Sequence, residues 1–226
     1  MAEIFDEWPE KYDRWFETPI GRLVREHESR LLLEMTRPRQ GEKILDVGCG
    51  TGVFTADLLA AGAQVTGLEL SLPMLKRAGK KASGRPFRMV LGDMRRLPFA
   101  AGSFEKTVSV TAIEFLDEDA GDAVAEMFRV TRPGGVIVVA SLNSLSPWAA
   151  RRRTATVQGH PIFTRARFRS PSEMADLATL PASIRTAIHF QKHDDPSQAV
   201  EIEKDGEVRR LDTGAFLAVC WEKPAA

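Results

Sequence analysis

The sequence predicts an α/β fold in which a mostly parallel β-sheet carries helices on both faces. Short apolar runs of the kind that buried parallel strands show lie at residues 44–47 and 136–140. Residues 117–130 have apolar positions at helical spacing and separate two of the predicted strands. Glycine-rich turns mark strand boundaries, as at residues 132–135. Strands that alternate with helices are typical of a parallel sheet.

Length and composition are those of a globular protein. A chain of 226 residues with 43% hydrophobic content fits one domain that buries about 70% of its unfolded surface. Its formal net charge of zero gives no reason to expect a nucleic-acid partner. The start of the chain lacks a signal-peptide pattern, and no run approaches the ~20 apolar residues that span a bilayer. Cys49 and Cys220 lack zinc-ligand spacing. We therefore expect a cytoplasmic protein without a metal, as a monomer or homodimer.

The first 40 residues are predicted to be helical. Aromatic side chains in residues 1–19 are interpreted either as packing on the domain or as a lid over a ligand: Phe5, Trp8, Tyr12, Trp15 and Phe16. Tyr12 is the only tyrosine of the chain, and its hydroxyl needs a polar partner if it is buried. A second helix is expected after Pro19 and should end before Pro38. His27 has charged neighbours and is predicted to lie on the surface.

A strand, a glycine-rich turn and the start of a helix form the central motif. Glycine permits positive φ and lets a ligand approach without obstruction by a Cβ atom. The start of the helix at residues 53–60 offers unpaired N–H groups. We therefore expect the turn to cradle a ligand through Gly48, Cys49, Gly50 and Gly52.

The glycine spacing distinguishes two classes of ligand. The dinucleotide fingerprint G-x-G-x-x-G would require glycine at position 53, which is valine here. Asp46 lies before the first glycine, where a carboxylate suits a cationic amino group better than a pyrophosphate. Glu69 ends the second predicted strand, residues 63–69, and an acid there can bond ribose hydroxyls. An amino-acid end, a ribose and no pyrophosphate describe S-adenosylmethionine (SAM) rather than a nicotinamide dinucleotide.

Four motifs in order resemble the class I SAM-dependent methyltransferases, in particular the type 11, ubiquinone-biosynthesis-like group. They are D-V-G-C-G-T-G at residues 46–52, the acid Glu69, Gly92-Asp93-Met94, and R-P-G-G at residues 132–135. The resemblance implies a Rossmann-like sheet of seven strands with one antiparallel strand near the C-terminus. It implies SAM as the cofactor and S-adenosylhomocysteine (SAH) as the product. It also places Asp93 and the backbone of Met94 at the adenine, and Tyr12 and Trp15 in a segment that covers the cofactor.

Further contacts are expected at the predicted strand ends. Leu70 and Met74 open the helix after the second strand, and Met74 is expected either near the adenine or in the core. The fourth strand ends at Thr111, which should line the cofactor because ligands of open α/β sheets bind outside the carboxyl ends of the strands. Glu114 and Phe115 should face the methyl acceptor. Glu114 is interpreted alternatively as a helix cap or a solvated side chain.

The segment after the fifth strand is predicted to cap the acceptor side. Asn143, Trp148 and Arg151 are expected to contact the substrate. Six arginines between residues 151 and 169 indicate either a solvated surface or a site for an anionic small-molecule acceptor. His160, like Glu114, is a candidate base. Two late strands, residues 182–193 and 214–221, are expected without a long helix between them, with a hairpin turn at residues 204–207.

These observations predict one domain over residues 1–226. It comprises a lid (1–40), a cofactor-binding core (41–142), a substrate-side cap (143–180) and C-terminal antiparallel strands (181–226). The expected reaction is in-line methyl transfer from SAM to an unidentified small molecule. It needs mainly alignment and exclusion of water, so no catalytic triad or metal is required. The alternative is a SAM- or SAH-binding regulatory or partner protein without turnover.

Overall fold

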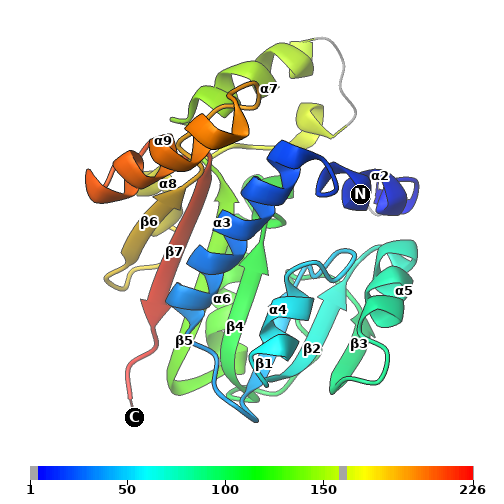
Figure 1. The fold of residues 1–226 in the computed structure, drawn as a ribbon. Helices are drawn as coiled ribbons and strands as arrows, with labels where there is room; N and C mark the ends of the chain where they lie inside the picture. Colours follow the sequence, from blue (N-terminus) through cyan, green and yellow to red (C-terminus); the bar gives the residue numbers. More distant parts are fainter. Residues whose placement is uncertain (1–4, 158–161, 226) are drawn as a thin grey trace.

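Seven strands form one sheet in a computed structural model that describes residues 5–157 and 162–225 (Figure 1). The strand order is β3-β2-β1-β4-β5-β7-β6, and β7 is antiparallel to both of its neighbours while the other pairs are parallel. The predicted fold class is therefore confirmed. The strands are β1 (Lys43–Val47), β2 (Gln64–Glu69), β3 (Phe87–Leu91), β4 (Phe104–Val110), β5 (Thr131–Leu142), β6 (Ser183–Ala187) and β7 (Phe216–Glu222).

Helices cover both faces of this sheet (Figure 1). Alternate strand residues point to opposite faces, so Ile44 packs with α3 and α4 while Leu45 packs with α6. The helices are α2 (Pro9–Trp15), α3 (Pro19–Thr36), α4 (Thr55–Ala60), α5 (Leu72–Lys81), α6 (Ala120–Val130), α7 (Pro147–Val157), α8 (Pro171–Ala175) and α9 (Pro196–Val208), with short 3₁₀ turns η1 (Ile113–Phe115) and η2 (Phe163–Arg165). Among the described residues, no helix is long and apolar enough to cross a membrane.

The strand order reverses at β1 and β4, which pair side by side in the middle of the sheet. The chain leaves β1 through the glycine-rich turn and returns to the sheet at β2, so this turn lies at the carboxyl end of the central strands. Gly50 has φ of 54°, a left-handed conformation that favours glycine. Such a reversal of strand order is where open α/β sheets bind ligands.

The region between β6 and β7 differs from the prediction. Instead of a polar hairpin with a turn at residues 204–207, the structure has the helix α9. Asp195 caps this helix by accepting a hydrogen bond from the backbone N–H of Ser197, and Pro196 occupies its first turn. Gly206, which suggested a turn, lies inside the helix because its missing side chain makes room for the ring of His189.

Two smaller differences concern β5 and β6. The R-P-G-G motif does not precede β5 as a separate turn but lies within it, where the register with β4 shifts between Phe104 and Lys106. Gly134 adopts φ of 71° in this irregular part of the strand. β6 ends at Ala187, earlier than predicted, because the backbone N–H groups of the next two residues bond to the side chain of Glu203.

Candidate functional site

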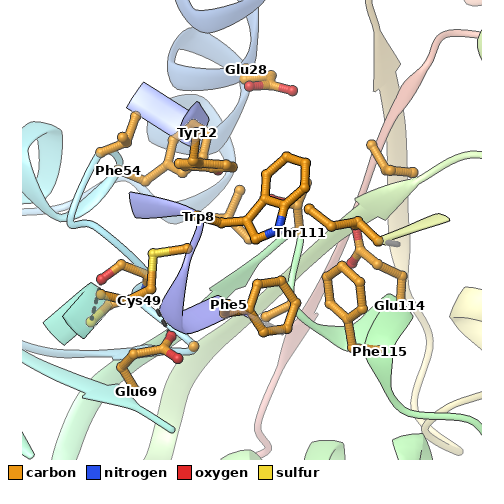
Figure 2. A pocket seen from close by; sticks show the side chains of 18 of the residues that line it. Phe5, Trp8, Tyr12, Glu28, Cys49, Phe54, Glu69, Thr111, Glu114 and Phe115 are labelled. Atoms are coloured by element: carbon orange, nitrogen blue, oxygen red, sulfur yellow. Dashed lines mark hydrogen bonds between the residues drawn. The ribbon is translucent and has the colours of Figure 1, made fainter. Parts of the chain in front are cut away.

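A cavity of about 600 Å³ lies at the carboxyl ends of the central strands, with α2 on one side of it (Figure 2). Its volume falls within the roughly 300–1,000 Å³ of small-molecule pockets. Residues of the glycine-rich turn form one end, and residues that follow β4 and β5 form the other. The cavity therefore joins the predicted cofactor region to the predicted acceptor region.

Glu69 links the glycine-rich turn to the start of α5. Its Oε2 accepts a hydrogen bond from the N–H of Gly50 at 2.9 Å, and its Oε1 accepts from the N–H groups of Leu70 and Ser71, each at 2.9 Å. These bonds favour the carboxylate, but burial is the larger effect and raises the pKa of Glu69. The side chain is thus fixed at the edge of the cavity, where the remaining lone pairs of its oxygens can accept further hydrogen bonds.

Asp46 lies at the same end of the cavity. It is 2% exposed, and its Oδ2 accepts a hydrogen bond from the Thr55 hydroxyl at 2.5 Å. Burial raises the pKa of Asp46 to about 7, and the nearby Glu69 adds to this effect. A cationic ligand group would be stabilised by these two acids and would lower their pKa values in return.

The glycines of the turn have different roles. A Cβ atom on Gly50 would meet nothing within 4 Å, so this residue borders open space. A Cβ atom on Gly52 would approach the Cβ of Ala78 to 2.9 Å, and Gly52 does not line the cavity. Gly52, a predicted cofactor contact, therefore allows α5 to pack closely, while Gly48, Cys49 and Gly50 line the cavity.

The predicted adenine region also lines the cavity through Leu70, Met74, Asp93 and Met94. Asp93 is paired with Arg95, whose guanidinium donates to both of its carboxylate oxygens at 2.6 to 3.1 Å. This pairing lowers the pKa of Asp93, so the side chain is ionised at neutral pH. The carboxylate is thus available as a hydrogen-bond acceptor in the cavity.

Helix α2 and the residues before it place aromatic rings in the cavity, and Figure 2 shows Phe5, Trp8 and Tyr12 there. The side chain of Tyr12 bonds to Thr111, and burial raises its pKa. Trp15 also lines the cavity and makes an edge-to-face contact with Trp148, with ring centroids 6.4 Å apart. All four rings come from the first helical segment and cover the ligand region.

This segment is held down by ion pairs. Asp13 accepts hydrogen bonds from the hydroxyl of Thr51 at 2.7 Å and from the Nζ of Lys81 at 2.6 Å, and it also pairs with Arg77. The hydroxyl of Ser71 donates to Asp6 at 2.6 Å. These contacts join α2 to the glycine-rich turn and to α5, and the basic partners lower the pKa of Asp13.

The residues after β4 lie at the other end of the cavity. Thr111 has φ of 49°, which is uncommon for a residue with a branched Cβ. Glu114 is 1% exposed and lines the cavity; its Oε2 accepts a weak bond from the Ser141 hydroxyl at 3.4 Å. Burial raises the pKa of Glu114 to about 7. Phe115 contacts Phe5 edge to face, at 4.8 Å between ring centroids.

Some of the residues predicted to contact the acceptor line the cavity and others do not. Trp148 and Arg151 line the cavity, and the Nε1 of Trp148 donates to the carbonyl of Phe190 at 2.6 Å. Asn143 does not line it; its amide donates to the carbonyls of Asp212 and Gly214 and fixes the end of β5 to the segment before β7. His160 lies outside the described residues.

Five charged residues that line the cavity were missing from the predicted site: Lys11, Glu28, Arg95, Arg152 and Lys192. Glu28 and Arg152 are the most buried of these groups. Glu28 is 6% exposed, and burial raises its pKa to about 8. The sequence contained a signal for it, because Glu28 shares its helical phase with the buried Val24, Leu31 and Met35 of α3. Arg152 was considered only among the arginines of the cap, and its position four residues after Trp148 was a usable signal.

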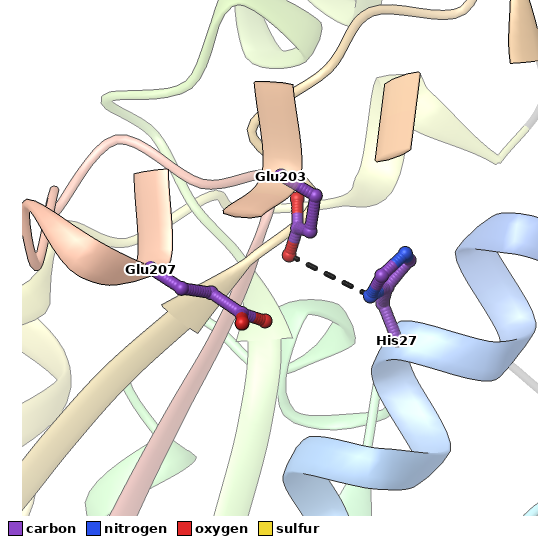
Figure 3. A group of neighbouring side chains, drawn as sticks. All are labelled: His27, Glu203 and Glu207. Carbon is purple, nitrogen blue, oxygen red and sulfur yellow. Dashed lines mark ion pairs between the residues drawn. The ribbon is translucent and has the colours of Figure 1, made fainter. Parts of the chain in front are cut away.

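A second polar cluster lies between α3 and α9 and contains His27, Glu203 and Glu207 (Figure 3). Contrary to the prediction, His27 is largely buried, with 12% of its side chain exposed, and burial lowers its pKa. The geometry could suit a cation, but Arg30 already bonds to the Nδ1 of His27 at 3.0 Å and pairs with Glu207. We therefore interpret this cluster as a structural contact between the two helices.

Comparison with known proteins identifies a methyltransferase domain, the family whose model matches residues 45–139. Demethylmenaquinone methyltransferase of Beutenbergia cavernae is 37% identical over 155 residues, which cover 66% of this chain and 60% of that protein. Malonyl-[acyl-carrier protein] O-methyltransferase of Salmonella typhimurium is 34% identical over 119 residues, or 53% of this chain and 46% of that protein. The chain thus spans about half of the length of these relatives.

Solved structures share the fold over nearly the whole chain. A SAM-dependent methyltransferase of Thermotoga maritima superposes with a TM-score of 0.73 at 22% identity, covering 99% of this chain and 100% of the other. Phosphoethanolamine N-methyltransferase 2 of Haemonchus contortus, solved in complex with SAM, gives 0.64 at 15% identity and covers 97% of this chain and 60% of the other. The resemblance predicted from the four motifs is confirmed.

Proposed function

We propose that this chain, a class I SAM-dependent methyltransferase by its family match and fold, transfers a methyl group from SAM to a small-molecule acceptor. One observation carries the proposal most directly. One cavity is lined both by the acid-flanked glycine turn and, beyond Thr111, by Phe115, Trp148 and Phe163. Room for a cofactor and an acceptor side by side is what a direct transfer between two bound molecules requires.

The residues at the cofactor end fit SAM chemically. Asp46 and the N–H groups of the glycine turn suit its amino-acid end, Glu69 its ribose hydroxyls, and Asp93 the amino group of its adenine. When bound, SAM supplies a methyl group already activated by the positive sulfonium. The protein then has to align the acceptor and exclude water, and the aromatic rings of the α2 segment can do the second.

A neutral hydroxyl or an ammonium group would have to lose a proton during transfer. Glu114 is our choice of acceptor for this proton, because its carboxyl group borders the cavity three residues after Thr111 and close to Phe115. Its pKa of about 7 is close to neutral pH, where a general base is most effective. Glu114 is therefore our candidate base.

Binding and turnover should be measured separately. Calorimetry with SAM and SAH tests the cofactor site, and release of SAH from SAM in an acceptor screen tests the reaction. The names of the relatives suggest the first acceptors, a demethylated menaquinol and a malonyl thioester. Absence of SAM and SAH binding would refute the proposal. Binding without SAH release from any acceptor or cell extract would favour the alternative, a non-catalytic SAM-binding protein.

A further inference from the structure

The guanidinium of Arg152 lies in an unusual environment at the acceptor end of the cavity. Its central carbon is 5.5 Å from the ring centroid of Trp148 and 5.8 Å from those of Phe163 and Phe168. Its Nη1 is buried and has no hydrogen-bond partner among the described residues. A buried donor on a charged group is costly unless something pairs with it. The site is therefore incomplete in the protein alone.

Two acids face Arg152 without neutralising it. They are Glu28 from α3 and Glu114 from η1, and neither is hydrogen-bonded to the guanidinium. Burial raises their pKa values, to about 8 and about 7, which favours the neutral forms of both acids. Burial lowers the pKa of Arg152 only to about 10, so the guanidinium keeps its charge at neutral pH.

Charged residues of both signs line the cavity. Asp46, Glu69 and Asp93 border the predicted cofactor region, where SAM would bring a positive sulfonium and ammonium. Arg151, next to Arg152 on α7, also lines the cavity, and Lys192 lies 5.3 Å from the ring centroid of Trp15, which contacts Trp148. An anionic group on the acceptor would be attracted to the cations around Trp148.

We propose that the methyl acceptor is a largely apolar molecule with a carboxylate or similar anionic oxygen group, which Arg152 binds. The inference rests on the proposed function, which assigns the opposite end of the cavity to SAM. A guanidinium can hold a carboxylate through two parallel hydrogen bonds, which would satisfy its buried Nη1. The rings of Phe115, Trp148 and Phe163 provide apolar walls for the body of the molecule. An ammonium acceptor would instead place a second cation beside Arg152.

Three probes with the same naphthalene body and polar groups of similar size test the charge preference. The full chain, saturated with SAH, is titrated by calorimetry with 2-naphthoate, 2-naphthamide and 2-naphthylmethylammonium. We expect the carboxylate to bind at least tenfold more tightly than the amide and the ammonium most weakly. Equal affinities, or a preference for the ammonium, would overturn the inference. If SAH itself fails to bind, the proposed function fails instead, so the two failures can be distinguished.

Variants of α7 then test whether Arg152 is the residue that causes the preference for a carboxylate. Arg152→Met should weaken 2-naphthoate binding at least tenfold while changing the affinity for 2-naphthamide and SAH less than twofold. Arg153→Met is the matched control, since Arg153 is exposed on the same helix, and should bind all three like the wild type. Arg152→Lys keeps the positive charge but loses the planar guanidinium. Its affinity for 2-naphthoate should lie between those of Arg152→Met and the wild type. An unchanged carboxylate preference in folded Arg152→Met or in Arg152→Lys would contradict the assignment.

Discussion

At the scale of single residues, the site depends on a few carboxyl groups that the fold buries. Glu69, Asp46, Glu28 and Glu114 all border the cavity, and burial raises the pKa of each. These carboxyl groups differ in the hydrogen bonds that they accept. Glu69 receives hydrogen bonds from three different backbone N–H groups, whereas Glu114 receives one from its own backbone and a long one from the Ser141 hydroxyl. We therefore expect Glu69 to act in binding and Glu114 to exchange protons.

Replacement of Glu69 by alanine should weaken SAH binding. The change removes the acceptor for three backbone N–H groups and for the proposed ribose contact, so we expect a loss of about 1–3 kcal/mol. Calorimetry measures this loss, and Glu201→Ala on the exposed side of α9 serves as a control. Equal affinity for SAH in Glu69→Ala and wild type would remove Glu69 from the site.

Glu28 should make the ligand-free protein less stable as the pH rises. Its pKa is about 8 in the folded state, above the usual value of 4.5 for a glutamate, so the folded state binds the proton more tightly than the unfolded chain. Its contribution to stability is present below pH 4.5 and is lost as the pH rises toward 8. In Glu28→Gln this part of the pH dependence, on the order of 3 kcal/mol, should disappear from urea unfolding curves measured between pH 5 and pH 8. Identical pH profiles for variant and wild type would show that Glu28 is not buried in solution.

At the scale of secondary-structure elements, α2 is joined to the rest of the site mainly through α5 and the glycine-rich turn. Its aromatic rings face the cavity, and polar contacts from Asp13 and Asp6 join the segment to the glycine-rich turn and α5. The sequence indicated either packing or a lid for these aromatic residues. The side chains line the cavity, which supports the lid as a proposal, while the anchoring acids could not be recognised without their distant partners.

Asp13→Ala should loosen this segment and speed the release of SAH. It removes contacts to Thr51, Arg77 and Lys81, and partly buried pairs of this kind are worth on the order of 1 kcal/mol. We expect the dissociation rate of SAH, followed by tryptophan fluorescence in stopped flow, to rise about tenfold. Glu7→Ala, an exposed acid just before the same helix, is the control. An unchanged rate in Asp13→Ala would show that these contacts do not hold a lid.

At the scale of the whole molecule, the sequence predicted the sheet and the cofactor end better than the acceptor end. A local sequence motif predicts the cofactor end, because the glycine turn, Asp46 and Glu69 are close in sequence or follow successive strands. Glu28 and Arg152 lie close together only because α3 and α7 both border the cavity. Their proximity could not be predicted from a local sequence pattern. The helix α9 was missed because its polar residues and Gly206 resemble a turn, while its buried contacts come from α3 and β6.

We expect the α9 region to contribute to the stability of the fold but not to SAH binding. The side chain of Glu203 accepts hydrogen bonds from the N–H groups of Ile188 and His189 and is 1% exposed. Glu203→Ala should lower the free energy of unfolding by about 2–4 kcal/mol, because two buried donors lose their acceptor. Urea unfolding measures this, with Glu201→Ala as control. SAH affinity of the folded variant should stay within twofold of wild type; a larger drop would connect α9 to the site.

The anchored position of α2 has a consequence for the order of events during turnover. The ion pairs of Asp13 tie α2 to α5, next to the glycine-rich turn, whereas Arg151 and Trp148 reach the cavity from α7. A segment held in this way has to open for cofactor exchange, so we expect SAM to bind before the acceptor and SAH to leave after the methylated product. Each catalytic cycle then ends with the exchange of SAH for a new SAM.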